Sequence, residues 1–114
     1  MTTKQFNKFY KDKILPTIEK MRKGGQEEYA NDLENIFANF DRSANRRGID
    51  RKTVIGCHMD KHFDGITNYI TNGKEQREDI DGRIADLIVY LMLLWASIEE
   101  DRSLLVNLID DLER

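Results

Sequence analysis

Acidic, amide and basic side chains recur at helical spacing in three parts of this sequence. The first series consists of Glu28, Asp32, Asn35 and Asn39. The second consists of Asp79, Arg83, Asp86 and Tyr90. The third consists of Lys61, Asp64 and Asn68, next to His58 and His62. Because residues three and four apart share a helix face, each series predicts a polar stripe along one edge of a helix.

The carboxylate of Asp86 is the most informative of these groups, because it interrupts the most apolar stretch of the chain, 84–98. Burying an ionised carboxylate without a partner costs several kcal/mol. We therefore expect Asp86 to face water, a cation or a hydrogen-bond network. If the stripes meet in a cleft, Glu28, Asp32 and Asp86 would repel one another and favour Mg²⁺ or Mn²⁺, which prefer oxygen ligands. Such an ion would bridge phosphate oxygens and activate water.

Structural interpretations of the same residues remain open. The two acids of the first series suit the positive start of a helix, and the acid in the apolar stretch could pair with Lys61 or Arg83. Tyr90 could be a core tyrosine with a satisfied hydroxyl. His58 and His62 have a spacing that can ligate Zn²⁺, but no second pair of Cys or His residues completes four ligands. His62 would otherwise lie at the edge of the core or contact a substrate.

Apolar residues at positions i, i+3 and i+4 predict helices for most of the chain. The expected elements are a first helix from Thr2 or Thr3 to Gly24-Gly25 that Pro16 kinks or restarts, a second over 26–47 closed by Gly48, a third from Asp50 to Asn72-Gly73, and a fourth from about Asp79. The segment SLLVNLIDDLER is a fifth helix or a continuation of the fourth, and its leucines need the bundle or a second subunit as a partner. We therefore expect one all-α domain over residues 1–114, a four- to five-helix bundle around one continuous apolar core.

Composition narrows the classes of partner and the compartment. The 114 residues carry a net charge of −3 at pH 7, which argues against binding duplex nucleic acid through its phosphates. Cys57 is the single cysteine, so no internal disulfide can form and nothing indicates an oxidising compartment. The charged start MTTKQFNKFYKDK has no signal-peptide core, and the stretch 84–98 is too short and too polar to span a membrane. We expect a cytoplasmic protein without a membrane partner.

Three segments carry a family resemblance: RKGGQEEYANDLENIFANF, MDKHFDGITNYI and DGRIADLIVYLMLL. They resemble small phage-encoded relatives of the MazG-like all-α nucleoside triphosphate pyrophosphohydrolases. The matching elements are Lys23-Gly24, Glu28-Tyr29, Asn39-Phe40, Lys61-His62, and Asp86 followed by Tyr90. The likeness extends from Arg22 to Leu94.

The resemblance implies a MazG-like helical bundle that forms a homodimer or higher homo-oligomer and holds Mg²⁺ or Mn²⁺. It implies cleavage of a (deoxy)nucleotide between its α- and β-phosphates, with release of pyrophosphate, in the cytoplasm of the bacterial host of a phage or prophage. Carried over, Glu28, Asp32 and Asp86 would hold the metal and serve catalysis. Substrate would be bound by Asn35, Asn39, Lys61, His62, Arg83 and Tyr90, with Lys61 and Arg83 on phosphates and the others on sugar or base.

The chain departs from the family pattern at both metal motifs. The enzymes have E-x-x-E and E-x-x-D, whereas here Glu28 and Asp32 are four residues apart and Arg83 precedes Asp86. Three functions are therefore open: hydrolysis of a nucleotide, sequestration of a nucleotide without turnover, and a phage protein-interaction module that inhibits a host factor. The third is suggested by the acidic surface and by the leucine-rich tail.

Overall fold

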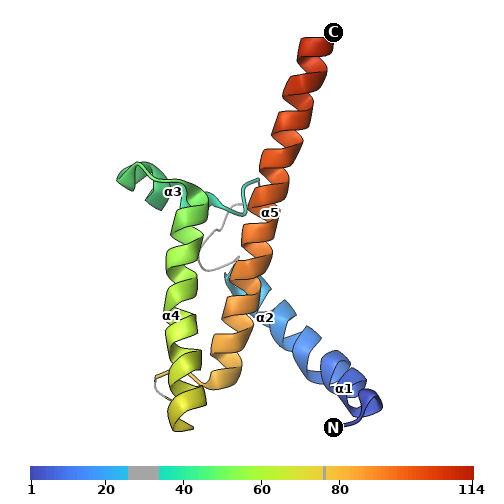
Figure 1. Cartoon of the computed structure of the whole chain (residues 1–114), viewed down its shortest axis with the longest axis vertical. Coiled ribbons are helices and arrows are strands. Elements are labelled where there is room, and N and C mark those ends of the chain that lie inside the picture. The colour runs from blue at the N-terminus through green and yellow to red at the C-terminus, as the bar shows by residue number, and fades with distance from the viewer. Residues whose placement is uncertain (26–33, 76) are drawn as a thin grey trace.

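Two long helices, α4 (Arg51–Asn72) and α5 (Ile80–Glu113), run antiparallel at the centre of the molecule in the computed structural model (Figure 1). Helix α3 (Ala38–Arg47) packs against α4, and an N-terminal helical unit packs against α5. The structure describes residues 1–25, 34–75 and 77–114. All regular structure among these residues is helical, so the predicted all-α bundle is confirmed. None of the described helices is long and apolar enough to cross a bilayer.

Capping residues begin and end the helices where the sequence predicts. Thr2 forms a capping box with the first turn of the N-terminal helix. Asp50 and Asp79 accept hydrogen bonds from first-turn amides of α4 and α5, at 2.7 Å and 2.6 Å. Gly48 and Gly73 follow the ends of α3 and α4 in the left-handed region, with φ of 63° and 67°. These local signals set the lengths of α3 and α4 and the position of the turn that joins α4 to α5.

The N-terminal unit consists of α1 (Thr3–Phe9), a π-helical segment η1 (Tyr10–Ile14) and α2 (Leu15–Gly25). The predicted disturbance at Pro16 takes the form of this π-helical segment directly before it. Proline lacks an amide hydrogen and its ring collides with a carbonyl of the preceding turn. The wider turns of a π-helix relieve that collision without ending the helix.

The single helix predicted over 26–47 is wrong in its described part, because residues 34–37 form turns and α3 starts after them. The side chain of Asn35 accepts a hydrogen bond from the amide of Phe37 at 2.9 Å. Asparagine competes in this way with the helical hydrogen-bond ladder and favours a turn. Residues 26–33 of that prediction lie outside the described residues.

The buried core is small and lies between α3, α4 and the middle of α5. It consists of Phe37, Phe40, Ala44, Val54 and Ile55, with Met59, Tyr90, Leu93, Leu94 and Ala96 packed against it. The tail continues α5 as one helix, which was one of the two predicted possibilities, and it projects beyond the core (Figure 1). The molecule extends over 56 × 36 × 26 Å and is therefore less compact than the predicted bundle around one continuous core.

Candidate functional site

A cleft of ≈ 310 Å³ opens between α2, α3, α4 and α5. Its lining consists of Met21, Arg22, Gly25, Ile36, Asn39, Phe40, His58, Lys61, Asp86, Val89, Tyr90 and Leu93. Four of the predicted site residues are in this set: Asn39, Lys61, Asp86 and Tyr90. They come from three helices, so the convergence of the polar stripes is a property of the bundle and not of any one segment.

Helical spacing brings the polar residues of each element onto the cleft. Asp86 and Tyr90 are one turn apart on α5, and His58 and Lys61 are one turn apart on α4. Asn39 lies in the first turn of α3. The expectation that Asp86 faces a polar space is met, since its side chain is 33% exposed and lines the cleft.

Aromatic rings form one wall of the cleft. Tyr90 stacks on His58 with 5.6 Å between ring centroids and 12° between the planes, and it also stacks on His62 at 5.6 Å. Phe40 packs its edge against His58 and Tyr90, at 5.7 Å and 6.2 Å. Burial lowers the pKa of His58, with a smaller contribution from Lys61, so its ring is a neutral aromatic surface at pH 7. Such a wall suits the stacking of a planar base.

Next to this wall, the buried ring of His62 lies between two carboxylates. Its Nδ1 is 3.9 Å from Oε2 of Glu78, and its Nε2 is 3.7 Å from Oδ2 of Asp86. The other oxygen of Glu78 receives the Lys61 ammonium at 3.1 Å. We call His62, Glu78 and Asp86 the His62 cluster; their ligand-capable atoms all lie within 4.8 Å of one another.

Burial dominates the electrostatics of the His62 cluster. It raises the pKa of Asp86, and Glu78 adds to this, while His62 opposes it. Burial also lowers the pKa of His62 against the pull of Asp86 and Glu78, which favours the neutral imidazole. The Lys61 hydrogen bond lowers the pKa of Glu78. A neutral imidazole beside two acids offers a lone pair that can accept a proton or bind a metal ion.

Arg83 was predicted to contact phosphate, but its side chain lies outside the cleft lining. It is buried, its Nη1 donates to the carbonyl oxygen of Lys61 at 3.3 Å, and it does not line the cleft. A Cβ at Gly65 would overlap the Cδ, Nε and Cζ atoms of Arg83, so the absence of a side chain there makes room for the guanidinium. Arg83 therefore ties α5 to α4. Among the described residues, no ion pair joins Asp86 to Arg83 or to Lys61.

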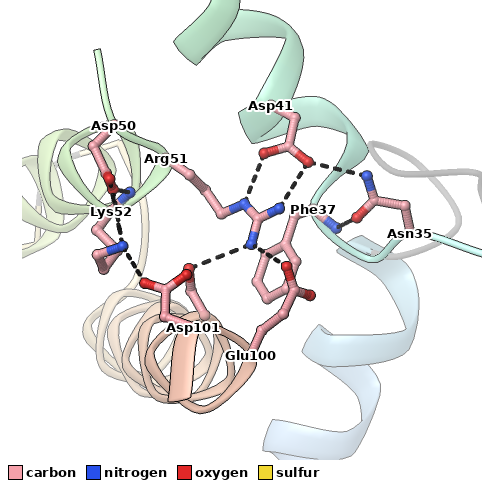
Figure 2. Close-up of polar contacts among 9 residues, drawn as sticks. Asn35, Phe37, Asp41, Asp50, Arg51, Lys52, Glu100 and Asp101 are labelled. Atoms are coloured by element: carbon pink, nitrogen blue, oxygen red, sulfur yellow. Dashed lines mark hydrogen bonds and ion pairs between the residues drawn. The ribbon is translucent and has the colours of Figure 1, made fainter. Parts of the chain in front are cut away.

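Asn35 is likewise separated from the cleft lining. It supports a second polar cluster, the Arg51 network, shown in Figure 2. Arg51 binds both oxygens of Asp41 at 2.7 Å and 3.0 Å, Glu100 at 3.1 Å and the hydroxyl of Ser97 at 3.4 Å. Asn35 donates to Asp41 at 3.0 Å. The contact partners of Arg51 come from α3 and α5, so spacing within one helix does not reveal this network.

Two predicted metal ligands, Glu28 and Asp32, lie outside the described residues. Sequence reasoning also missed Glu78, which precedes the cap of α5 in the turn after α4 and so belongs to no helical stripe. The sequence signal that could have identified Glu78 is the pair Lys61-His62. An acid in the segment that follows α4 can reach both this cation and this imidazole.

No family model, no curated protein and no solved structure matches this chain. The MazG-like resemblance therefore stays a prediction.

Proposed function

We propose that the cleft binds a nucleoside triphosphate and that the protein cleaves it, in a Mg²⁺- or Mn²⁺-dependent reaction that releases pyrophosphate. The observation that carries this proposal is the meeting of Asn39, Lys61, Asp86 and Tyr90, from three helices, at one cleft. A volume of ≈ 310 Å³ lies at the lower end of the range for small-molecule sites. We also propose that this chain is a relative of the MazG-like pyrophosphohydrolases.

The cleft divides into parts that match the parts of a nucleotide. The stacked rings of His58 and Tyr90 offer a face for the base. The cations of Lys61 and Arg22 lie on the lining, where they would meet phosphate oxygens. The amide of Asn39 supplies both a donor and an acceptor for sugar or base.

Asp86 fits the role of a metal ligand, because its carboxylate is partly buried yet exposed to the cleft. Burial raises its pKa, and a bound cation would reverse that effect by favouring the ionised form. Glu28 and Asp32 are the proposed co-ligands. When bound, a magnesium ion would neutralise phosphate charge and lower the pKa of an attacking water.

Incubation with a panel of ribo- and deoxynucleoside triphosphates, with Mg²⁺ or Mn²⁺, tests this proposal through the pyrophosphate and monophosphate released. We expect Asp86→Asn to lower turnover at least about 100-fold, because it removes a charged group that touches the metal or the phosphates. Asp60→Asn is the matched control, since Asp60 is an exposed aspartate of the neighbouring helix α4 and does not line the cleft. Absence of turnover with every nucleotide at high protein concentration contradicts the enzymatic proposal.

A second candidate function is sequestration of a nucleotide without turnover. The observation that favours it is Arg83, which occupies the position of an expected acidic ligand and is committed to α4. Thermal-shift measurements with the same nucleotides, cyclic ones included, separate this function from hydrolysis. A ligand at 100 times its Kd stabilises the native state by about 2.7 kcal/mol. Stabilisation without product indicates sequestration, and no shift with any nucleotide excludes it.

We also propose that the protein forms a homodimer or higher homo-oligomer through the tail of α5, in the cytoplasm of a phage-infected bacterium. The apolar side chains of the tail stay uncovered in the single chain, with Leu105, Leu108 and Leu112 exposed by 59%, 58% and 80%. Their spacing of three and four residues forms a stripe of the kind that pairs helices. Light scattering should give more than one chain per particle, and replacing the three leucines by Gln should give one. A monomeric wild type contradicts self-association and turns attention to a host protein as the partner.

A further inference from the structure

We infer that His62, Glu78 and Asp86 form a binding site for a transition-metal ion of the zinc type, where the first turns of α5 and the residue before its cap lie against the middle of α4. This site shares Asp86 with the proposed magnesium ligands Glu28, Asp32 and Asp86. Its other two ligands, His62 and Glu78, are different. It does not depend on the proposed function, because an ion can bind here whether or not the cleft accepts a nucleotide.

The distances within the His62 cluster suit ligands that share an ion better than groups that bind one another. The two His62–carboxylate distances of 3.9 Å and 3.7 Å are too long for hydrogen bonds. Two ligands of a tetrahedral zinc ion, each about 2.0–2.1 Å from the metal, lie about 3.3 Å apart. All three donors fall within 4.8 Å of one another, so small side-chain movements bring them to this spacing.

An unsatisfied atom points to the same ligand. The side chain of His62 is 5% exposed, and its Nδ1 is buried without a hydrogen-bond partner among the described residues. Buried polar atoms in native proteins are nearly always satisfied, and an ion is one of the ordinary explanations when they are not. This nitrogen faces Glu78, so the orphaned atom and the nearby acid belong to one site.

The donor set selects the class of metal. An imidazole nitrogen favours zinc and the neighbouring transition metals over magnesium, and the two carboxylates supply negative charge to balance the ion. Three protein ligands leave a coordination position open for water or for a ligand in the cleft that Asp86 lines.

Lys61 contributes to this site without being a ligand. It holds Oε1 of Glu78 at 3.1 Å, while Oε2 of the same carboxylate faces His62. A hydrogen bond to one oxygen orients the other, as the outer partners of metal ligands commonly do. Lys61 is therefore a positioning residue for Glu78.

Titration of the full chain with Zn²⁺ alone, followed by calorimetry and by metal analysis after dialysis, tests the site. We expect one Zn²⁺ per chain with micromolar or tighter affinity, and Mg²⁺ at millimolar concentration should not displace it. Glu78→Gln should weaken binding at least tenfold; Glu78 lies in the turn and is only half-buried, so this variant keeps the helices intact. Asp60→Asn should bind as the wild type does.

One further variant, Cys57→Ser, tests the neighbouring surface groups. Cys57 and His58 are both exposed on α4 and could capture zinc by themselves. If Cys57→Ser abolishes binding while Glu78→Gln leaves it unchanged, the proposal is wrong. Absence of stoichiometric binding by the wild type also overturns it. Because no nucleotide is present in this experiment, neither result bears on the proposed hydrolysis.

Discussion

The Arg51 network and the His62 cluster are two versions of one arrangement, one at the start of α4 and the other in its middle. In each, a nitrogen-bearing side chain of α4 lies between two acids, at least one of which comes from α5. Arg51 contacts Asp41 and Glu100 at 2.7–3.1 Å, with its guanidinium 4.1 Å from the centroid of the Phe37 ring. His62 stays 3.7–3.9 Å from its acids and leaves one nitrogen unsatisfied. The first cluster is complete by itself, and the second is incomplete without another ligand.

The chemistry of the central residue explains this difference. Arginine is always charged and offers five donors in a planar fork, so it can satisfy two carboxylates and a hydroxyl together. A neutral histidine has one donor and one acceptor, and its acceptor cannot satisfy an ionised acid. The two aspartates show the result, since the Arg51 hydrogen bonds lower the pKa of Asp41 while burial raises that of Asp86. The Arg51 network stabilises the fold. The His62 cluster has an unsatisfied nitrogen and two acids that can bind a further ligand beside the cleft.

The largest effect should come from breaking the complete cluster. Arg51→Met keeps most of the side-chain volume but removes the Arg51 hydrogen bonds to Asp41 and Ser97 and removes the cation from the Phe37 ring. We expect a loss of about 2–3 kcal/mol in the free energy of unfolding, measured by urea denaturation. Arg47→Met, at the exposed end of α3, should change it by less than about 0.5 kcal/mol. Equal losses in the two variants would mean that the network adds nothing beyond surface charge.

The next effect tests the contact by which Arg83 joins α5 to α4 beside the His62 cluster. Gly65→Ala introduces a Cβ that overlaps the buried Arg83 side chain, so the guanidinium must leave the Lys61 carbonyl. We expect a loss of about 1–2 kcal/mol, measured by the same denaturation experiment. Gly56→Ala is the matched control on α4, because a Cβ there meets nothing within 4 Å. It should stabilise the protein by up to about 1 kcal/mol through helix propensity, and a stabilising Gly65→Ala would contradict the assigned role of Arg83.

The same substitution in the two clusters should have opposite signs. Asp86→Asn removes a charge that burial disfavours, so metal-free protein in the presence of a chelator should gain about 0.5–1 kcal/mol of stability. Asp41→Asn removes a charge that Arg51 stabilises, so this variant should be less stable than the wild type. Thermal unfolding of both variants measures the two signs. A destabilised Asp86→Asn would show that the ionised carboxylate is already satisfied in the metal-free protein, as the Arg51 network is.

The sequence predicts most of the local structure but only part of the candidate site. Gly48, Asp50, Gly73 and Asp79 act through their own backbone conformation or their own first turn, so helix ends can be recognised from a few neighbouring residues. The polar stripes on α4 and α5 also follow from helical periodicity alone. This periodicity therefore predicts Lys61, Asp86 and Tyr90 as site residues.

The residues that sequence reasoning missed or misplaced depend on contacts between elements. Glu78 acts from a turn and reaches His62 through the fold. Arg51 meets partners that are 10 and 49 positions away in the sequence, so no local pattern identifies them. Asn35 has the spacing of a helical stripe, but its side chain bonds the backbone two residues ahead and forms a turn instead. Periodicity describes a helix face correctly only where no side chain offers the backbone another partner.

The smallest expected effect is the acid dependence of the complete cluster. The pKa of Asp41 is lowered in the native state below its ordinary value of 3.8, first by the hydrogen bond from Arg51. The unfolded chain therefore binds a proton before the native state does as the pH falls. The contribution of Asp41 is complete above about pH 5, and it declines as the pH falls through 3.8 toward the lowered native value.

Urea denaturation at a series of pH values between 6 and 3 isolates this contribution when the wild type is compared with Asp41→Asn. We expect the difference in unfolding free energy between the two proteins to shrink by up to about 1 kcal/mol over that range, since the amide cannot titrate. A matched comparison with Asp60→Asn should show no such trend, because Asp60 is exposed and lies outside the Arg51 network. A difference between wild type and Asp41→Asn that stays constant down to pH 3 would mean that the Arg51 hydrogen bonds act through geometry alone, and the contrast between the two clusters would then lie in packing rather than in charge.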